Sequence, residues 1–146
     1  MKGHRFRVAP VALRFGLVLL LSGACVTSMA GAPDGGRVQT GTWGGEHAAL
    51  TVIDSGAHLE FDCASGDITR PLTTDRDGRL AVDGVFVQEH AGAVRLGEEP
   101  ERKPARYVGR LSGKTLTFDV VLIDSNETIG SFTLTFGAAP HVRKCR

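Results

Sequence analysis

The side chains best able to do chemistry in this chain are the histidines that follow its first thirty residues. They are His47, His58, His90 and His141. Metal sites usually place histidine or cysteine ligands a few residues apart, as in H-x-x-x-H or C-x-x-C. These histidines show no such spacing. We therefore expect no metal site and place the four side chains on the surface of the protein.

One histidine has a carboxylate on the same face of its segment. His58 and Glu60 lie two residues apart where polar and apolar residues alternate, so their side chains could touch. Such a pair does acid–base catalysis only beside a reacting group. Ser55, Ser65 and Ser112 each precede a glycine in expected turns, and G-x-S-x-G is absent. The sequence therefore favours a protein that is not an enzyme.

A short acidic segment has part of the spacing of a calcium loop. Asp75, Asp77 and Gly78 match that pattern, but Thr73 and Gly84 stand where the loop needs its first and last carboxylates. We interpret the segment as a turn between strands. The glycines are also not in phosphate-binding order before a helix, so we expect no cofactor.

The first thirty residues have the layout of an export signal. A basic start ends at Arg14, the apolar run Phe15 to Leu21 follows, and small residues continue to Ala30. The apolar run is far shorter than the ~20 residues of a membrane-spanning helix. We therefore expect residues 1–30 to be removed and the protein to work outside the cytoplasm, in the periplasm or as a secreted protein.

Two processing sites fit this signal. Ser28 and Ala30 suit ordinary cleavage, which makes Gly31 the first residue. The segment Ser22 to Cys25 is similar to the box of bacterial lipoproteins, although Ser22 stands where that box usually has Leu, Val or Ile. With either site Cys25 lies outside the folded domain, and a lipid on Cys25 is the only membrane contact that we expect.

The two remaining cysteines predict one disulfide. Paired cysteines in an exported chain are usually bonded to each other, which joins Cys63 to Cys145. Alternation places Cys63 on the apolar face of its strand with Leu59 and Phe61, and we expect the bond to be buried there. The bond would tie the C-terminal tail to an early strand.

The charge of the mature chain excludes one class of partner. The full chain has a formal net charge of +1, but the signal holds Lys2, Arg5, Arg7 and Arg14 and no acidic residue. Removal of the signal therefore leaves a slightly acidic protein. No run of lysine or arginine appears in it, so we do not expect a nucleic-acid partner.

The pattern from Gly41 onward is that of strands. Apolar residues recur with a period of two, turn residues separate the segments, and no helical period appears. We expect an all-β fold: one antiparallel meander of about six to eight strands that closes into a small barrel over residues 41–146. Residues 31–40 contain glycine and proline and are expected to form a flexible lead-in.

Two finer expectations follow from the same pattern. A turn centred on Ser55 and Gly56 would place Val52 opposite Leu59 and Leu50 opposite Phe61. The predicted inward residues are bulky, which favours a filled core over a ligand cavity. The inward set is Leu50, Val52, Leu59, Phe61, Leu80, Val82, Phe86, Tyr107, Leu116, Phe118, Leu122, Phe132, Leu134 and Phe136.

The longest irregular stretch covers residues 90–104. Connections of this length are often recognition loops, although a solvated excursion of mixed charge has the same composition. The segment 42–47, just before the second expected strand, is the other candidate contact site. The candidate binding surface is therefore Trp43, Glu46, His47, His90 and Arg95.

Several motifs give the chain a family resemblance. GTWGG at residues 41–45, with EFDCASG, PARY and the closing KC, resembles a family of small exported bacterial proteins without an assigned activity. The G-x-W at the start of the first strand is similar to that of lipocalins and avidin-like barrels. There is a looser similarity to exported β-barrel inhibitors of metalloproteases and lysozyme. These resemblances imply a compartment and a fold and bring no site residues.

We therefore expect an exported, non-catalytic barrel that binds a partner through its surface or the loop at residues 90–104. One alternative is an inhibitor of a secreted hydrolase, either a protease or lysozyme. The other is a carrier of a small apolar ligand, which would need an open lumen.

Overall fold

The structure, a computed structural model, describes residues 35–89 and 100–145. Cys25, His90 and Arg95 lie outside these residues, as does the predicted signal. In the described part we find no helix with the length and hydropathy of a membrane span. The strands are β1 (Gly41–Gly44), β2 (Ala48–Ile53), β3 (Gly56–Phe61), β4 (Ala64–Ile68), β5 (Arg79–Gln88), β6 (Arg102–Ser112), β7 (Thr115–Leu122) and β8 (Thr128–Phe136).

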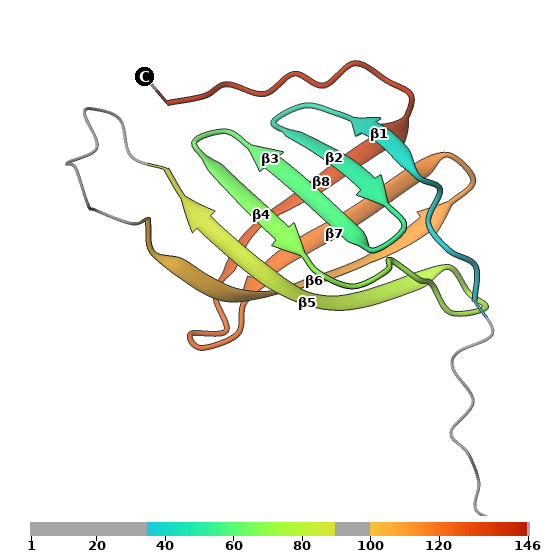
Figure 1. The fold of residues 1–146 in the computed structure, drawn as a ribbon, viewed down its shortest axis with the longest axis horizontal. Helices are drawn as coiled ribbons and strands as arrows, with labels where there is room; N and C mark the ends of the chain where they lie inside the picture. Colours follow the sequence, from blue (N-terminus) through green and yellow to red (C-terminus); the bar gives the residue numbers. More distant parts are fainter. Residues whose placement is uncertain (1–34, 90–99, 146) are drawn as a thin grey trace, which may run out of the picture. The chain divides into compact units, whose positions relative to one another are not determined.

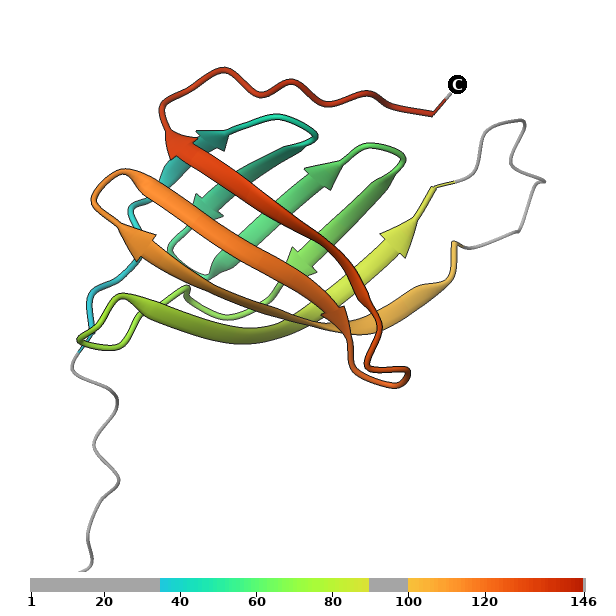
Figure 2. The ribbon, with the colours of Figure 1, turned by 180° about the vertical axis from the view of Figure 1, so that it is seen from behind.

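The eight strands form one closed antiparallel barrel (Figures 1 and 2). Each strand pairs with the next along the chain, and β8 returns to pair with β1. The predicted all-β meander barrel is confirmed. Because strands alternate in direction, the turns after β1, β3, β5 and β7 lie at one end of the barrel. The turns after β2, β4 and β6 lie at the other end.

Alternation along each strand separates the lumen from the outer face. In β7, Leu116, Phe118 and Val120 are buried, whereas Thr117 and Asp119 between them are exposed. Successive side chains of a strand point to opposite faces, so this pattern fixes which face of β7 points inward. Of the predicted inward residues, all are buried except Phe132 and Phe136, which are partly buried and pack against the core.

The β2–β3 hairpin keeps its predicted faces but has a different register. Ile53 pairs with Gly56, so Asp54 and Ser55 form the turn, and Leu50 is opposite Leu59. The predicted pairing of Leu50 with Phe61 is therefore wrong by two residues. A shift of two leaves every side chain on the same face, which is why the core prediction survived the error.

The seam between β1 and β8 depends on two aromatic rings. Only Trp43↔Phe136 and Gly44↔Thr135 pair there. The rings of Trp43 and Phe136 meet edge to face with centroids 5.2 Å apart, and Trp43 Nε1 donates to Gln39 O at 3.0 Å. Trp43 is only 1% exposed. It therefore belongs to the core and not to the binding surface proposed for it from the sequence.

Residues 35–40 pack against the barrel instead of forming the flexible lead-in expected there. Val38 is buried, and its backbone N–H donates to Leu72 O at 3.0 Å. Thr74 donates from its backbone N–H and its hydroxyl to Gly36 O. The apolar side chain of Val38 provides the reason, because it joins the core cluster beside Leu72. These residues lie at the end of the barrel that has the turns after β2, β4 and β6, and we call it the lead-in end.

The lumen is filled. A cavity of about 10 Å³ remains between Leu50, Leu59, Tyr107 and Phe118 and the apolar side chains next to them. One water molecule needs roughly 10–15 Å³ measured in this way, and ligand pockets have volumes of about 300–1,000 Å³. This part of the lumen therefore has no space for an apolar ligand, as the bulk of the inward residues predicts.

Tyr107 fills the lumen because two glycines make room for its ring. A Cβ atom at Gly66 would collide with Tyr107 Oη, and one at Gly84 would lie 3.1 Å from Tyr107 Cε2. The phenol donates to Val85 O at 2.9 Å. Desolvation raises the pKa of this phenol, so it stays a neutral donor.

We expect Gly66→Ala to lower the free energy of unfolding by about 1–3 kcal/mol, because the added methyl group overpacks the lumen against Tyr107. The loss should be smaller when Gly66→Ala is made in a Tyr107→Phe background, where the colliding oxygen is absent. Urea unfolding of the two single variants and the double variant measures this coupling. Equal losses in both backgrounds would contradict the contact.

Candidate functional site

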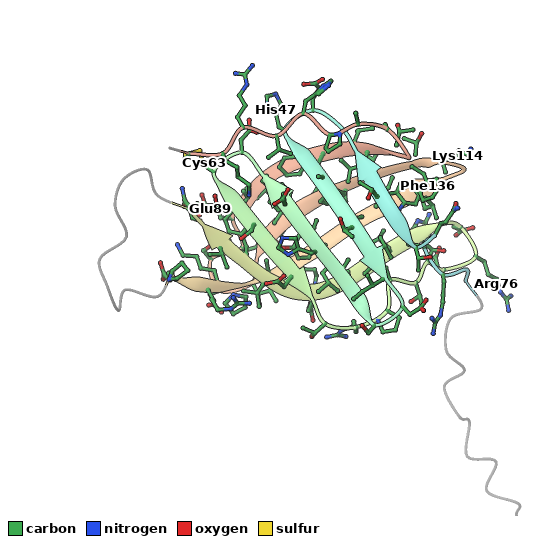
Figure 3. The ribbon with its side chains drawn as sticks, turned by 45° about the horizontal axis from the view of Figure 1, so that its top comes forward. His47, Cys63, Arg76, Glu89, Lys114 and Phe136 are labelled. Atoms are coloured by element: carbon green, nitrogen blue, oxygen red, sulfur yellow. A yellow bond between two sulfur atoms is a disulfide. The ribbon has the colours of Figure 1, made fainter. Side chains whose placement is uncertain are left out.

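The C-terminal segment His141–Cys145, which we call the strap, runs beside the turns that follow β1 and β3 (Figures 1 and 3). The two turns are residues 45–47 and 62–63. We call the end of the barrel at which these turns lie the strap end. It contains Glu46 and His47, two of the residues proposed from the sequence as a binding surface. Apart from Cys145, no feature of the sequence pattern predicts the path of the strap.

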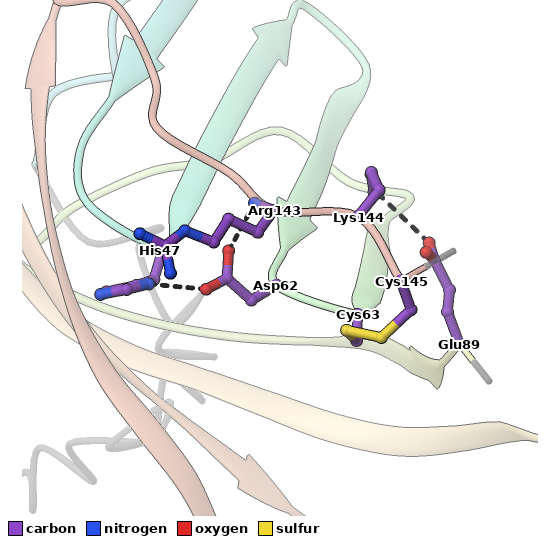
Figure 4. Close-up of a disulfide and its surroundings, with 7 residues drawn as sticks. All are labelled: His47, Asp62, Cys63, Glu89, Arg143, Lys144 and Cys145. Atoms are coloured by element: carbon purple, nitrogen blue, oxygen red, sulfur yellow. Dashed lines mark hydrogen bonds and ion pairs between the residues drawn. A yellow bond between two sulfur atoms is a disulfide. The ribbon is translucent and has the colours of Figure 1, made fainter. Parts of the chain in front are cut away.

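The predicted disulfide is present and anchors the strap. Cys63 and Cys145 are bonded, with Cα atoms 4.8 Å apart and a sequence separation of 82 (Figure 4). Cys63 lies in the β3–β4 turn with a φ of 55° and is half-buried. The expected place on the apolar face of β3 is therefore wrong, because the strand ends at Phe61 and the turn redirects the Cys63 side chain toward the strap.

Backbone hydrogen bonds hold the strap along its length. The N–H of His47 donates to His141 O at 2.9 Å, and the N–H of His141 donates to Gly45 O at 2.9 Å. Further along, the N–H of Cys63 donates to Arg143 O at 3.2 Å. These bonds resemble the pairing of a short added strand, and Glu46 and His141 form an isolated parallel bridge.

Two histidines of the strap end pair with carboxylates. His47 Nδ1 donates to Asp62 Oδ2 at 2.6 Å, and His141 Nδ1 donates to Glu46 Oε1 at 2.6 Å. Asp62 also accepts from the backbone N–H of Arg143 at 2.7 Å (Figure 4). One carboxylate thus links the β1–β2 turn, the β3–β4 turn and the strap.

These contacts stabilise the ionised carboxylates. The backbone N–H of Arg143, followed by the His47 side chain, lowers the pKa of Asp62 below its usual value. The hydrogen bond from His141 is the main cause that lowers the pKa of Glu46. Beside Cys145, Lys144 Nζ lies 3.2 Å from Glu89 Oε1 and 3.6 Å from Glu60 Oε1. The strap end therefore carries a surplus of carboxylates, which are held in place, beside the cations Arg143 and Lys144.

The remaining described histidine forms its pair elsewhere. His58 Nδ1 donates to Asp67 Oδ1 at 2.7 Å, and Arg102 donates to the same carboxylate at 3.1 Å. The expected contact of His58 with Glu60 is thus replaced by one with Asp67, its direct partner on β4. The cause is strand pairing, because neighbours across a ladder are closer than residues two apart in one strand.

His58 lies in a row of polar side chains on the outer face of the barrel. Thr51, His58 and Asp67 lie in one cross-strand row on the outer face, which is the order of a nucleophile, a base and an acid. Thr51 and His58 are both exposed to solvent there. Residues 35–89 and 100–145 contain no group of three metal-ligating side chains close enough to hold an ion.

Of the predicted recognition loop at residues 90–104, the structure describes residues 100–104. The prediction is wrong for residues 102–104, because they belong to β6 and pair with β5. The connection begins after Glu89, which follows β5 and contacts Lys144 of the strap. It enters β6 at Arg102, which bonds Asp67. The two ends of this connection are thus fixed next to the strap and to the His58 pair. Comparisons with protein-family models, curated proteins and solved structures find no match for this chain.

We expect loss of the disulfide to destabilise the fold. Closure of a loop of 82 residues is expected to contribute about 4–5 kcal/mol through the entropy of the unfolded chain. Cys63→Ser with Cys145→Ser should therefore lower the free energy of unfolding by up to about that amount. Denaturant unfolding checks this, with the wild type plus reductant as a second form of the same change. An unchanged midpoint would contradict a structural role for the bond.

Acid should weaken the strap through Asp62. Its folded pKa lies below the ordinary value of 3.8, so the unfolded chain binds more protons as the pH falls below that value. The contribution of Asp62 is complete above that range and is lost as the pH falls through the folded pKa. Asp62→Asn should flatten the dependence of the unfolding midpoint on pH below about pH 5. The exposed turn variant Asp124→Asn should leave that dependence as in the wild type, and equal slopes in all three proteins would contradict the linkage.

Proposed function

We propose that the protein is exported and non-catalytic and binds a partner protein through the strap end. The supporting observation is the filled lumen, where only about 10 Å³ remains beside Leu50 and Tyr107. A barrel packed in this way has its outer surface available for recognition. Transport of an apolar ligand is correspondingly disfavoured, because a ligand would have to displace well-packed core side chains.

The rigidity of the strap end supports its use as a binding surface. Turns that are held by a disulfide and by backbone hydrogen bonds lose little conformational freedom when a partner binds. Glu46 and His47 occupy one such turn, and Asp62 and Cys63 occupy another. The connection between β5 and β6 begins next to them, because the N–H of Glu89 donates to Cys63 O at 2.9 Å.

The charge of the strap end favours a partner with a basic surface. Glu46, Asp62 and Glu89 lie there together, and the turn after β7 adds the exposed residues Asp124 and Glu127 at the same end of the barrel. Complementary charge accelerates association and selects among partners. Contacts with a basic partner would therefore weaken as the salt concentration rises.

Inhibition of a secreted hydrolase is the second candidate function. It is supported by the same rigid acidic turns, which suit insertion against a basic enzyme surface, and by the looser resemblance to exported barrel inhibitors. The resemblance to a family of small exported bacterial proteins stays a prediction. So do the export signal, the periplasmic or secreted location and a lipid on Cys25.

We expect charge reversal at the strap end to abolish partner binding. The test variant is Glu46→Lys with Glu89→Lys, and the matched control is Asp54→Lys with Asp77→Lys at the lead-in end. Quantitative co-purification from the envelope of the producing cell should identify a protein that the wild type and the control retain, with a salt-dependent affinity, and that the test variant loses. A partner retained equally by all three proteins would contradict the proposal.

A titration separates the two candidate functions. Purified protein is added to a basic lysozyme and to secreted proteases, and the remaining enzyme activity is measured. Stoichiometric loss of activity that the strap-end variant fails to produce would support inhibition. Full activity at molar excess, together with a retained partner in the co-purification, would exclude inhibition of these enzymes and leave recognition without inhibition.

A further inference from the structure

The lead-in end of the barrel carries a cluster of exposed cations. Topology and backbone contacts bring them together from four parts of the chain. The Arg37 segment bridges to Thr73, Leu111 N donates to Gly78 O at 2.7 Å, and Phe136 N donates to Lys114 O at 2.9 Å. Figure 3 shows Arg76 and Lys114 on the opposite side of the view from Cys63 and Glu89. We call this cluster the cationic end: Arg37, Arg70, Arg76, Arg79, Arg110 and Lys114, all exposed.

The carboxylates nearby neutralise only part of this charge. Asp54 lies 4.0 Å from Arg37, and Asp77 lies 3.1 Å from Arg79. Asp75 accepts hydrogen bonds from the backbone N–H groups of Asp77 and Arg79, which binds it into its own turn.

Two cations of the cluster keep an unneutralised charge. Arg110 and Lys114 form no ion pair with any residue in the ranges 35–89 and 100–145. Arg110 is also the direct cross-strand partner of Arg79. Like charges opposite each other destabilise a sheet, and Asp77 forms an ion pair with Arg79 but not with Arg110.

An apolar side chain protrudes beside the cations. Ile53, at the β2–β3 turn, is 56% exposed. It borders a groove of about 240 Å³ that Arg37, Thr40 and Pro71 also line. Cations next to an exposed apolar residue match the interface of a membrane, where headgroup charge lies above hydrocarbon.

The described part of the chain begins at the lead-in end of the barrel. Gly35, the first described residue, lies next to Thr74 and Asp75 of the β4–β5 loop. It lies ten positions along the sequence from Cys25, and an extended chain of that length spans at most about 33–36 Å. A lipid on Cys25 would thus hold the lead-in end, rather than the acidic strap end, close to a membrane.

We infer that the cationic end docks on an anionic phospholipid surface and orients the barrel with its strap end away from the membrane. The two ends have opposite charge, so an anionic leaflet attracts one and repels the other. A single lipid chain or a single basic patch binds membranes weakly, and the two together hold a protein stably. The inference is independent of the proposed partner binding, which uses the opposite end.

The test uses vesicle co-sedimentation with protein exported as Cys25→Ala, so that it carries no lipid, and purified without detergent. Vesicles of phosphatidylglycerol in phosphatidylcholine should bind the protein, and pure phosphatidylcholine vesicles should not. Raising NaCl from about 0.1 M to about 1 M shortens the Debye length from about 10 Å to about 3 Å and should release it.

Matched variants locate the contact. Arg110→Gln with Lys114→Gln should lower the partition coefficient roughly 10- to 30-fold, the effect of removing two cations near an anionic leaflet. Lys103→Gln with Lys144→Gln removes the same charge near the strap end and should leave binding unchanged. Unfolding midpoints equal to that of the wild type establish that both variants are folded.

Three results would overturn the inference. They are equal binding to both kinds of vesicle, equal loss of binding in the two double variants, and absence of vesicle binding with retention on a polyanionic polysaccharide. The partner assay at the strap end is unaffected by any of these results, so failure of membrane docking and failure of partner binding are distinguishable.

Discussion

Filling of the lumen is the constraint on which the rest of this structure depends. Eight strands close around a space that side chains just fill, and the closed ladder removes the free edges of the sheet. Tyr107 occupies the space that Gly66 and Gly84 leave, and its phenol satisfies Val85 O. Trp43 and Phe136 close the seam where β1 and β8 share few pairs. With the interior occupied, the two ends and the outer face remain for function.

The two ends of the barrel are stabilised by different interactions. The strap end is held by a disulfide and by carboxylates that accept bonds from histidine and backbone groups. The lead-in end is held by Val38 against Leu72 and carries arginine and lysine around its rim. In an antiparallel meander, consecutive turns lie at opposite ends of the barrel. Acidic residues in one set of turns and basic residues in the other set therefore lie at opposite ends.

Period-two alternation made the barrel and most of its core predictable from the sequence. The β7 pattern of Leu116, Phe118 and Val120 admits only one inward face. The register of the strands was harder to predict from the sequence, because a two-residue shift in the β2–β3 hairpin leaves every side chain on the same face. The disulfide followed from cysteine count and compartment, whereas its place in a turn depends on where β3 ends.

The candidate sites were harder to predict because long-range contacts create them. His47 meets Asp62 from a different turn, and Glu46 meets His141 from the far end of the chain. The spacing of these residues along the sequence does not predict such pairs. Trp43 shows the opposite difficulty: its place in the segment 42–47 made it a candidate contact residue, but its ring packs against Phe136 at the seam.

The measurement that tests the filled lumen most directly is the mass of the protein purified from its own cell envelope, taken first in the native state and then after denaturation without reductant. We predict the same mass in both states, because a packed barrel carries no small molecule, with the disulfide seen as a mass two protons below the reduced form. A covalent lipid on Cys25 would add mass to both states equally. A non-covalent molecule lost on denaturation would contradict a filled lumen and would assign the barrel a ligand.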